Sequence, residues 1–410
     1  MSGWQDLNIG SICIKIIDYR GKTPEKVLSG TKLITSKVIK NSRILDNANF
    51  EYIRDDKYEE VMRRGKPEFQ DILFTTEAPL GEVALIKSDE KIAIAQRIIL
   101  LRADQDKVIP DFLFYSLRGP IGYNRVQQKG TGTTVLGIKN PELKKVILPI
   151  PPLPTQQKIA KILSNYDDLI ENNLKRIKLL EESARLTYEE WFLHFRIDGK
   201  KLDIDAESGL PFGWKRKSIT SIGDVNKYSI SVKTAPKKIK YIDISATETG
   251  VYRKPDYLEF KDAPSRARRK LNYGDTIFST VRPNRKIYAL VLEDDPTLIA
   301  STGFAVITPK DPLHFPYIYL SLSAQCFIDS AVAVAGGAAY PAINQSSFER
   351  LEVTVPSENI LNKFCDSASF YLKTKNVLLN QNQLLIKARD ILLPRLMTGM
   401  IDTDDMDVVL

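Results

Sequence analysis

The sequence predicts an α+β fold with two repeated mixed α/β domains, joined by two long helices that pair as an antiparallel coiled coil with pseudo-two-fold symmetry. Two observations support this prediction. Each half of the 410-residue chain ends in a stretch with apolar residues at heptad spacing. In addition, motifs of the first half return roughly 205 residues later, which is the signature of an internal repeat.

The first heptad stretch predicts a long helix that needs a partner. Steps of four and three residues from Ile159 reach Leu163 and continue to Trp191. This spacing of about 3.5 residues per turn is typical of a coiled coil, although a single amphipathic core helix shows a similar pattern. A proline-rich, polyproline-like segment up to Pro154 precedes the helix, and Thr155 is expected to cap it.

The second heptad stretch provides that partner within the same chain. It starts at Phe364, and each of its seam positions lies 205 residues after a seam position of the first helix. Three seam positions hold the polar residues Lys375, Asn382 and Arg389. Buried polar residues at such positions are expected to fix the register and orientation of the pair.

The repeated motifs outside the helices predict two related globular domains. Trp4 returns as Trp214, and the strand-like run FQDILFTT, with Asp71, returns as YGDTIFST, with Asp275. The segment GTTVLGIKNPELKKVILPIP matches GGAAYPAINQSSFERLEVTVP. Each half is therefore expected to be a globular domain followed by a long helix.

These patterns divide the chain into five predicted segments. The runs VALIK and IAIAQRIILLR are expected to be strands, DFLFYSL a short buried helix, and the stretch from Arg196 to Trp214 a polar linker. Ser357 is expected to cap the last helix, Pro394 to kink or end it, and Gly399 to close it. The segments are a first domain at 1–152, a helix at 153–198, a second domain at 199–356, a helix at 357–400 and a tail at 401–410.

The composition, with 43% hydrophobic and 27% charged residues, is ordinary for a soluble protein of two or three domains. The sequence has no secretion leader and no apolar run of about 18 residues, so a cytoplasmic location is expected. The cysteines Cys13, Cys326 and Cys365 are too scattered for a zinc site or a disulfide framework. No metal or cofactor is therefore expected on this chain.

The net charge of +8 is concentrated in the second domain. The segment from Lys215 to Lys286 holds 18 Lys and Arg and 7 Asp and Glu, an excess of 11 positive charges. One basic run is usually a solvated face, but KKIK, RARRK and RPNRK are three runs in one domain, interleaved with tyrosines. Such clusters suit a polyanion that requires phosphate neutralisation and base contacts, so nucleic acid is the expected ligand.

Candidate DNA contacts follow from these runs and from isolated basic residues. In the first domain they are Arg20, Lys22, Arg43, Arg63, Arg64, Lys66, Lys129 and Thr133. In the second domain they are Lys227, Tyr228, Lys237, Lys238, Lys240, Arg266, Arg268, Arg269, Lys270, Arg282, Asn284, Arg285 and Lys286. The RARRK run is expected to contact phosphates, whereas Arg282, Asn284 and Arg285 are the expected base readers.

No motif for catalysis accompanies the basic runs. The sequence lacks a phosphate-binding loop of the type G-x-x-x-x-G-K-[ST] and a Gly-rich cofactor loop after a strand. Asp256, Glu259 and Lys261 superficially resemble a nuclease metal motif, but chance better explains two carboxylates this close in sequence. His194 and His314 have no metal-ligand spacing and are interpreted as structural.

The half-length repeat, the junction LPIPPLPTQQKIAKIL and the C-terminal LLPRLMTGMI resemble the DNA-specificity (S) subunit of type I restriction-modification systems. The resemblance covers essentially the whole chain. It implies two target recognition domains, each reading one half of a split, asymmetric DNA site, and a coiled coil that sets their separation. The second junction, TVPSENILNKF, departs from the family pattern because it lacks the proline-rich run and the glutamine pair of the first.

The same resemblance implies a non-catalytic subunit that assembles with enzymes. Its partners would be two methyltransferase subunits, which use S-adenosylmethionine to methylate adenine, and optionally motor-nuclease subunits that use ATP and Mg. Two alternatives stay open. The subunit could serve a fused restriction-methyltransferase, or the chain could be a coiled-coil scaffold unrelated to DNA.

Overall fold

The computed structural model describes residues 3–19, 24–45, 49–336 and 341–403. The chain divides into two compact units: unit 1 comprises Met1–Asn172 and Asn382–Leu410, and unit 2 comprises Asn173–Gln381. Unit 2 is continuous in sequence, whereas unit 1 combines the beginning of the chain with its end. Each unit has its own sheets and its own core, as the internal repeat predicts.

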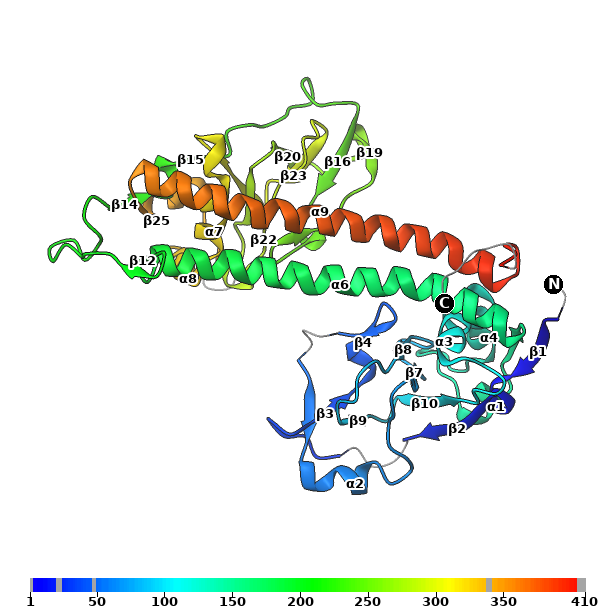
Figure 1. Cartoon of the computed structure of the whole chain (residues 1–410). Coiled ribbons are helices and arrows are strands. Elements are labelled where there is room, and N and C mark those ends of the chain that lie inside the picture. Colours follow the sequence, from blue (N-terminus) through cyan, green and yellow to red (C-terminus); the bar gives the residue numbers. More distant parts are fainter. Residues whose placement is uncertain (1–2, 20–23, 46–48, 337–340, 404–410) are drawn as a thin grey trace. The chain divides into compact units, whose positions relative to one another are not determined.

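Two helices of 40 residues each, α6 (Leu153–Phe192) and α9 (Glu358–Met397), confirm the predicted long helices (Figure 1). Each helix contributes one part to unit 1 and the other part to unit 2. Among the described residues, no helix is both long enough and apolar enough to cross a membrane.

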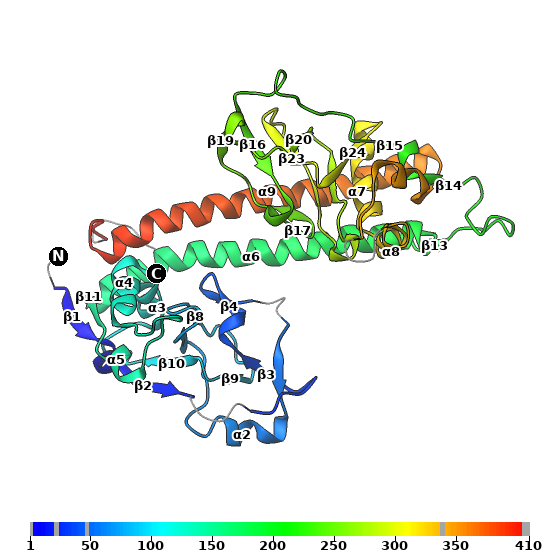
Figure 2. The same cartoon turned by 180° about the vertical axis from the view of Figure 1, so that it is seen from behind.

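The polar seam residues lie where the heptad pattern predicts. Lys375, Asn382 and Arg389 have exposed fractions of only 7%, 6% and 8%. Polar contacts between α6 and α9 join Asp167 to Arg389 and Ile170 to Asn382 in unit 1, and Asn173 to Gln381 and Glu181 to Lys375 in unit 2. In each unit the residue number falls along one helix as it rises along the other, so the pairing is antiparallel, as predicted (Figure 2).

The start of α6 differs from the prediction. The helix begins at Leu153, so Thr155 lies inside the first turn and does not cap it. Pro154 is tolerated there because the first N–H groups of a helix have no partner within the helix. Pro149 lies in a strand that pairs with the N-terminal strand, so the junction is not a polyproline segment throughout.

The last helix also corrects one expectation. It begins directly after Ser357, as predicted, but Pro394 lies inside it and does not end it. Leu396 and Met397, which follow the proline, are buried in the core of unit 1, and this packing holds the final turn. Gly399 then closes the helix with a φ of +65°, a conformation that favours glycine.

Unit 1 contains two main sheets, with strand orders β2-β10-β7-β8 and β6-β3-β9, and a β1-β11 pair. The strands are β1 (Gln5–Asn8), β2 (Cys13–Asp18), β3 (Thr31–Ile34), β6 (Glu51–Ile53), β7 (Ile72–Thr75), β8 (Val83–Leu85), β9 (Ile92–Ile94), β10 (Ile98–Ala103) and β11 (Ile147–Ile150), with a short β4-β5 pair (Ile39–Lys40 and Arg43–Ile44). The helices are α1 (Ile9–Ile12), α2 (Tyr58–Val61), α3 (Pro110–Arg118), α4 (Pro120–Lys129) and α5 (Asn140–Lys144). The predicted strands and the buried helix DFLFYSL are therefore confirmed.

Unit 2 repeats this arrangement with the sheets β15-β24-β21-β22 and β19-β16-β23-β20 and the pair β14-β25. The strands are β14 (Lys215–Ser218), β15 (Gly223–Val225), β16 (Lys238–Ile242), β19 (Tyr257–Glu259), β20 (Ala267–Lys270), β21 (Thr276–Ser279), β22 (Tyr288–Leu290), β23 (Leu298–Ser301), β24 (Phe304–Pro309) and β25 (Glu352–Val355), and the helices are α7 (Phe315–Ser323) and α8 (Gln325–Ala333). Strand β20 lies between β19 and β21 in sequence, where unit 1 has helix α2 between β6 and β7. The RARRK run thus forms an additional strand of unit 2.

The predicted polar linker, residues 196–214, is more ordered than expected. It contains a hairpin of β12 (Arg196–Ile197) and β13 (Lys200–Lys201). Leu210 and Trp214 are buried, with exposed fractions of 4% and 5%, in the main core of unit 2. These two apolar side chains explain why the segment packs against the unit.

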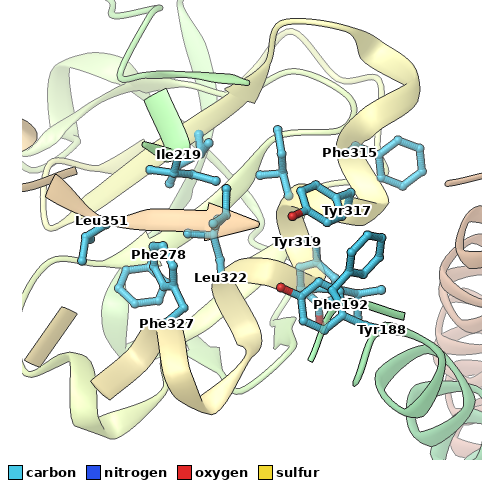
Figure 3. Close-up of a cluster of buried hydrophobic side chains, with 14 of the residues drawn as sticks. Tyr188, Phe192, Ile219, Phe278, Phe315, Tyr317, Tyr319, Leu322, Phe327 and Leu351 are labelled. Atoms are coloured by element: carbon cyan, nitrogen blue, oxygen red, sulfur yellow. The ribbon is translucent and has the colours of Figure 1, made fainter. Parts of the chain in front are cut away.

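An aromatic cluster anchors α6 in unit 2 (Figure 3). The ring of Phe192 lies 4.8 Å from those of Tyr317 and Phe364 and 5.6 Å from that of Trp214, measured between centroids. Tyr188, one turn earlier on α6, contacts Phe192 at 5.2 Å. The helix is therefore part of the core of the unit and not an appendage to it.

Candidate nucleic-acid interface

The turn after β21, residues 282–286, has a fixed backbone. Arg282 and Lys286 adopt left-handed conformations at its two ends, with φ values of +51° and +54°. The Arg282 N–H donates to the Pro341 carbonyl at 2.8 Å, and Thr249 Oγ1 donates to the Lys286 carbonyl at 2.8 Å. A left-handed non-glycine residue costs of order 1–3 kcal/mol and persists only when its surroundings hold it. These two hydrogen bonds are such constraints.

The same turn brings the predicted base readers together. Pro283 is buried and anchors the turn, while Asn284, Arg285 and Lys286 are exposed. Arginine can donate two hydrogen bonds to guanine, and asparagine can pair with the edge of adenine. The turn therefore exposes side chains whose hydrogen-bonding groups match those of base edges.

Unit 1 has an equivalent turn with different side chains. Ala78 has a φ of +50° and precedes Pro79 after β7, as Arg282 precedes Pro283 after β21. Residues 77–82 therefore join the candidate interface of unit 1, although they include no basic residue that the sequence analysis could single out. The internal repeat identifies them, because FQDILFTT precedes this turn and its counterpart YGDTIFST precedes the turn at 282–286.

The basic strand β20 does not present equivalent side chains. Arg266 is exposed, and Arg268 lies over the Phe260 ring, 5.4 Å from its centre. Burial lowers the pKa of Arg269, whose Nη1 donates to Ser229 Oγ at 3.3 Å. Within this run Arg266 is therefore the residue best placed to contact a phosphate, together with the half-buried Lys270.

The lysines of β16 have acidic partners. Lys240 Nζ donates to Asp295 Oδ2 at 2.8 Å and lies 4.7 Å from the centre of the Tyr257 ring. Burial alone would raise the pKa of Asp295, but hydrogen bonds from Lys240 and from Thr297 lower that pKa to about 2. Lys238 Nζ lies 3.7 Å from the Glu259 carboxylate. Counting lysines therefore overstates the charge that this strand offers to phosphates.

The other candidates are scattered over the surfaces of their units. Lys227, Tyr228 and Lys237 are exposed, and Lys227 Nζ lies 2.7 Å from the Asp224 carboxylate. In unit 1, Arg43, Arg63 and Thr133 are exposed. Arg64 donates to the Asp18 carbonyl, Lys66 pairs with Glu59 at 2.7 Å, and Lys129 lies 3.9 Å from Glu142. Arg20 and Lys22 lie outside the described residues.

Both histidines form hydrogen bonds with neighbouring side chains. His194 Nδ1 lies 3.0 Å from Glu190 Oε1, and His314 Nε2 lies 3.0 Å from Asn362 Oδ1. Over the part of the chain that the structure describes, no three His, Cys, Asp or Glu side chains gather in a way that could hold a metal ion.

Comparison with known proteins gives a consistent result. Residues 1–182 match the family described as "Type I restriction modification DNA specificity domain". The chain is 24% identical to the type I restriction enzyme MjaIX specificity subunit of Methanocaldococcus jannaschii, over 82% of this chain and 78% of that protein. It is 22% identical to the HindI specificity subunit of Haemophilus influenzae, over 80% and 86%. Its fold is similar to the crystal structure of the type I S subunit from M. genitalium, with a TM-score of 0.59, 16% identity and 96% of each chain covered.

Proposed function

Because the chain belongs to the type I restriction-modification specificity family, we propose that it reads a bipartite, asymmetric DNA site. The predicted domains 1–152 and 199–356 would each read one half-site. The turn at 282–286 carries this proposal, since exposed Asn284, Arg285 and Lys286 stand on a backbone that hydrogen bonds hold in place. Methyl transfer and DNA cleavage would belong to partner subunits and not to this chain.

The helix pair would set the unread spacer between the half-sites. Each helix has 40 residues and rises about 1.5 Å per residue, which gives it the length to act as a ruler. Methylome sequencing of a host with and without this gene tests the proposal as a whole. A methylated motif with two short halves and an unread spacer is expected to appear only with the gene.

Two other outcomes would redirect the proposal. Co-purification with one fused restriction-methyltransferase would indicate a different enzyme assembly around the same DNA reader. Failure of the chain and of its complex to bind duplex DNA at any salt concentration would favour a coiled-coil scaffold unrelated to DNA.

Replacing both Asn284 and Arg285 by Ala is expected to weaken binding to the cognate duplex by roughly 10- to 100-fold, because a bidentate base contact contributes about 1–3 kcal/mol of discrimination. Fluorescence anisotropy with cognate and random duplexes measures the effect. The matched control is Lys237→Ala, an exposed lysine for which cognate and random affinity should fall together and the salt slope should decrease by about one. An unchanged ratio of cognate to random affinity in the double variant would contradict base reading by this turn.

The helices also carry exposed apolar residues that a partner could cover. On α9, Phe370 and Val377 have exposed fractions of 65% and 62% in unit 2. Steps of seven residues place such side chains along one side of a helix. This spacing suits a helix of a methyltransferase subunit that docks against α9.

Introducing Phe370→Glu together with Val377→Glu is expected to abolish co-purification with the methyltransferase subunit, since two carboxylates would be buried on docking. Unfolding by urea should change little, because both residues are exposed on the free chain. Lys178→Glu, on an exposed position of α6, serves as the charge control. If the double variant still assembles like this control, the docking surface lies elsewhere.

A further inference from the structure

We propose that Lys375 is a positioning residue, which ties the helix pair of unit 2 to the base-reading turn at 282–286. The connection runs through a short hairpin between β17 (Thr247–Glu248) and β18 (Val251–Tyr252). This inference rests on the proposed DNA-reading function, and it assigns to a helix residue a part in the specificity of one half-site.

The Lys375 ammonium connects three elements of unit 2. The residue lies on a seam position of α9 and is 7% exposed. Its Nζ lies 2.6 Å from Glu181 Oε1 on α6 and donates to the Gly250 carbonyl at 3.0 Å. Burial alone would lower the pKa of this ammonium, but Tyr319 and Glu181 beside it keep the pKa above its ordinary value. The lysine is therefore charged at neutral pH and joins both helices to the hairpin.

Gly250 fits the tip of the hairpin for two reasons. Its φ of +78° favours glycine, and a Cβ there would lie 3.2 Å from Tyr319 Oη and 3.3 Å from Lys375 Nζ. A larger residue would therefore strain the backbone and press against the ammonium. The absence of a side chain lets the hairpin tip approach α9 closely enough for its carbonyl to accept a hydrogen bond.

The hairpin tip in turn holds the base-reading turn. The Gly250 N–H donates to the Tyr288 carbonyl at 2.8 Å, and Thr249 Oγ1 donates to the Lys286 carbonyl at 2.8 Å. Lys286 ends the turn that presents Asn284 and Arg285. Two adjacent residues, Thr249 and Gly250, thus link the helix pair to the turn.

Helix pairing alone does not explain a lysine at position 375. Its seam neighbour Leu378 is an ordinary buried apolar residue, with an exposed fraction of 4%. Replacing a buried ion pair by apolar side chains is often neutral or stabilising, because charges lose hydration on burial. The hydrogen bond to the Gly250 carbonyl requires a donor, which an apolar residue at position 375 could not supply.

Replacing Lys375 by Met keeps an unbranched side chain that is one heavy atom shorter and removes the ammonium donors. The expected result, measured on single-base-changed duplexes, is a loss of discrimination on the order of tenfold in the half-site that unit 2 reads, and no change in the other half-site. Affinity for random DNA should stay at the wild-type value, because Lys375 is buried and contacts no phosphate. Hydrogen exchange should become faster in residues 282–290.

Thr249→Val provides a second variant that leaves the helix pair unchanged, since Thr249 is exposed and its hydroxyl donates to Lys286. It is expected to lose discrimination in the same half-site. The seam control is Asn382→Leu, a buried polar residue of α9 in unit 1, for which discrimination in the unit 2 half-site should not change. If wild-type protein discriminates and both Lys375→Met and Thr249→Val discriminate equally well, the positioning role is excluded while the DNA-reading function stands. A wild-type complex that does not discriminate would overturn the proposed function and this inference together.

Discussion

The Asp275→Asn variant is expected to be more stable than the wild-type chain at pH 8, by up to about 3 kcal/mol. Asp275 has an exposed fraction of 0%, and burial raises its pKa from 3.8 to about 6. The folded state therefore holds this proton more tightly than the unfolded state does. The contribution of this proton to the free energy of unfolding is fully present below about pH 4 and is lost as the pH rises through about 6. The amide does not titrate, so this part of the pH dependence should disappear.

Urea unfolding of both proteins between pH 4 and pH 8 measures this difference, with the signal of unit 2 followed through its tryptophans. The internal repeat provides the control. Asp71, the equivalent residue of unit 1, accepts hydrogen bonds from Arg102 Nε and Nη2 at 2.8 Å each. Asp71→Asn should therefore destabilise, by about 3–5 kcal/mol, because it leaves the arginine without its buried partner. Destabilisation of the same size by Asp275→Asn at pH 8 would refute the explanation.

Replacing Phe192 by Ala is expected to lower the free energy of unfolding by about 3–5 kcal/mol, the usual cost of truncating a buried phenylalanine. The ring is 1% exposed and contacts Tyr317 of α7, Phe364 of α9 and Trp214. The cavity would therefore open where α6 enters the core of unit 2.

Urea unfolding monitored by Trp fluorescence measures this loss. Leu193→Ala is the matched control, because Leu193 is the next residue and 40% exposed, so its truncation should cost far less. Similar losses for the two variants would mean that the aromatic cluster does not anchor the helix.

The sequence was most informative where the pattern is regular. Heptad spacing and the internal repeat were enough to predict α6, α9 and the antiparallel pairing, since seam positions repeat over many turns. Helix ends were less predictable, because tertiary packing decides them. Pro394 remains helical since the core of unit 1 holds the turn that follows, and no local signal at the proline reveals that packing.

The interface was only partly predictable, because partners lie far away in sequence. Lys240 belongs to a basic run, yet Asp295, 55 residues later, accepts its hydrogen bond. Asp71 and Asp275 stand in the same repeated motif, but Thr308 takes the place of Arg102 on the neighbouring strand. Comparison of the two motifs shows that the carboxylate is repeated, but it does not show that unit 2 lacks an arginine equivalent to Arg102. The turn at 77–82 holds no Lys or Arg, so basic composition could not predict it, and only its position in the repeat relates it to the turn at 282–286.

Unit 1 is synthesised first but completed last. Unit 2 is one continuous segment, so all its residues are present before the end of α9 has been made. The core of unit 1, in contrast, includes Leu393, Leu396 and Met397, near the end of the chain. The N-terminal part must therefore keep an apolar surface open until the last helical turn leaves the ribosome. A chain that stops early in α9 would leave that surface uncovered, so the last turns of α9 are required to complete the core of the first-made part of the protein.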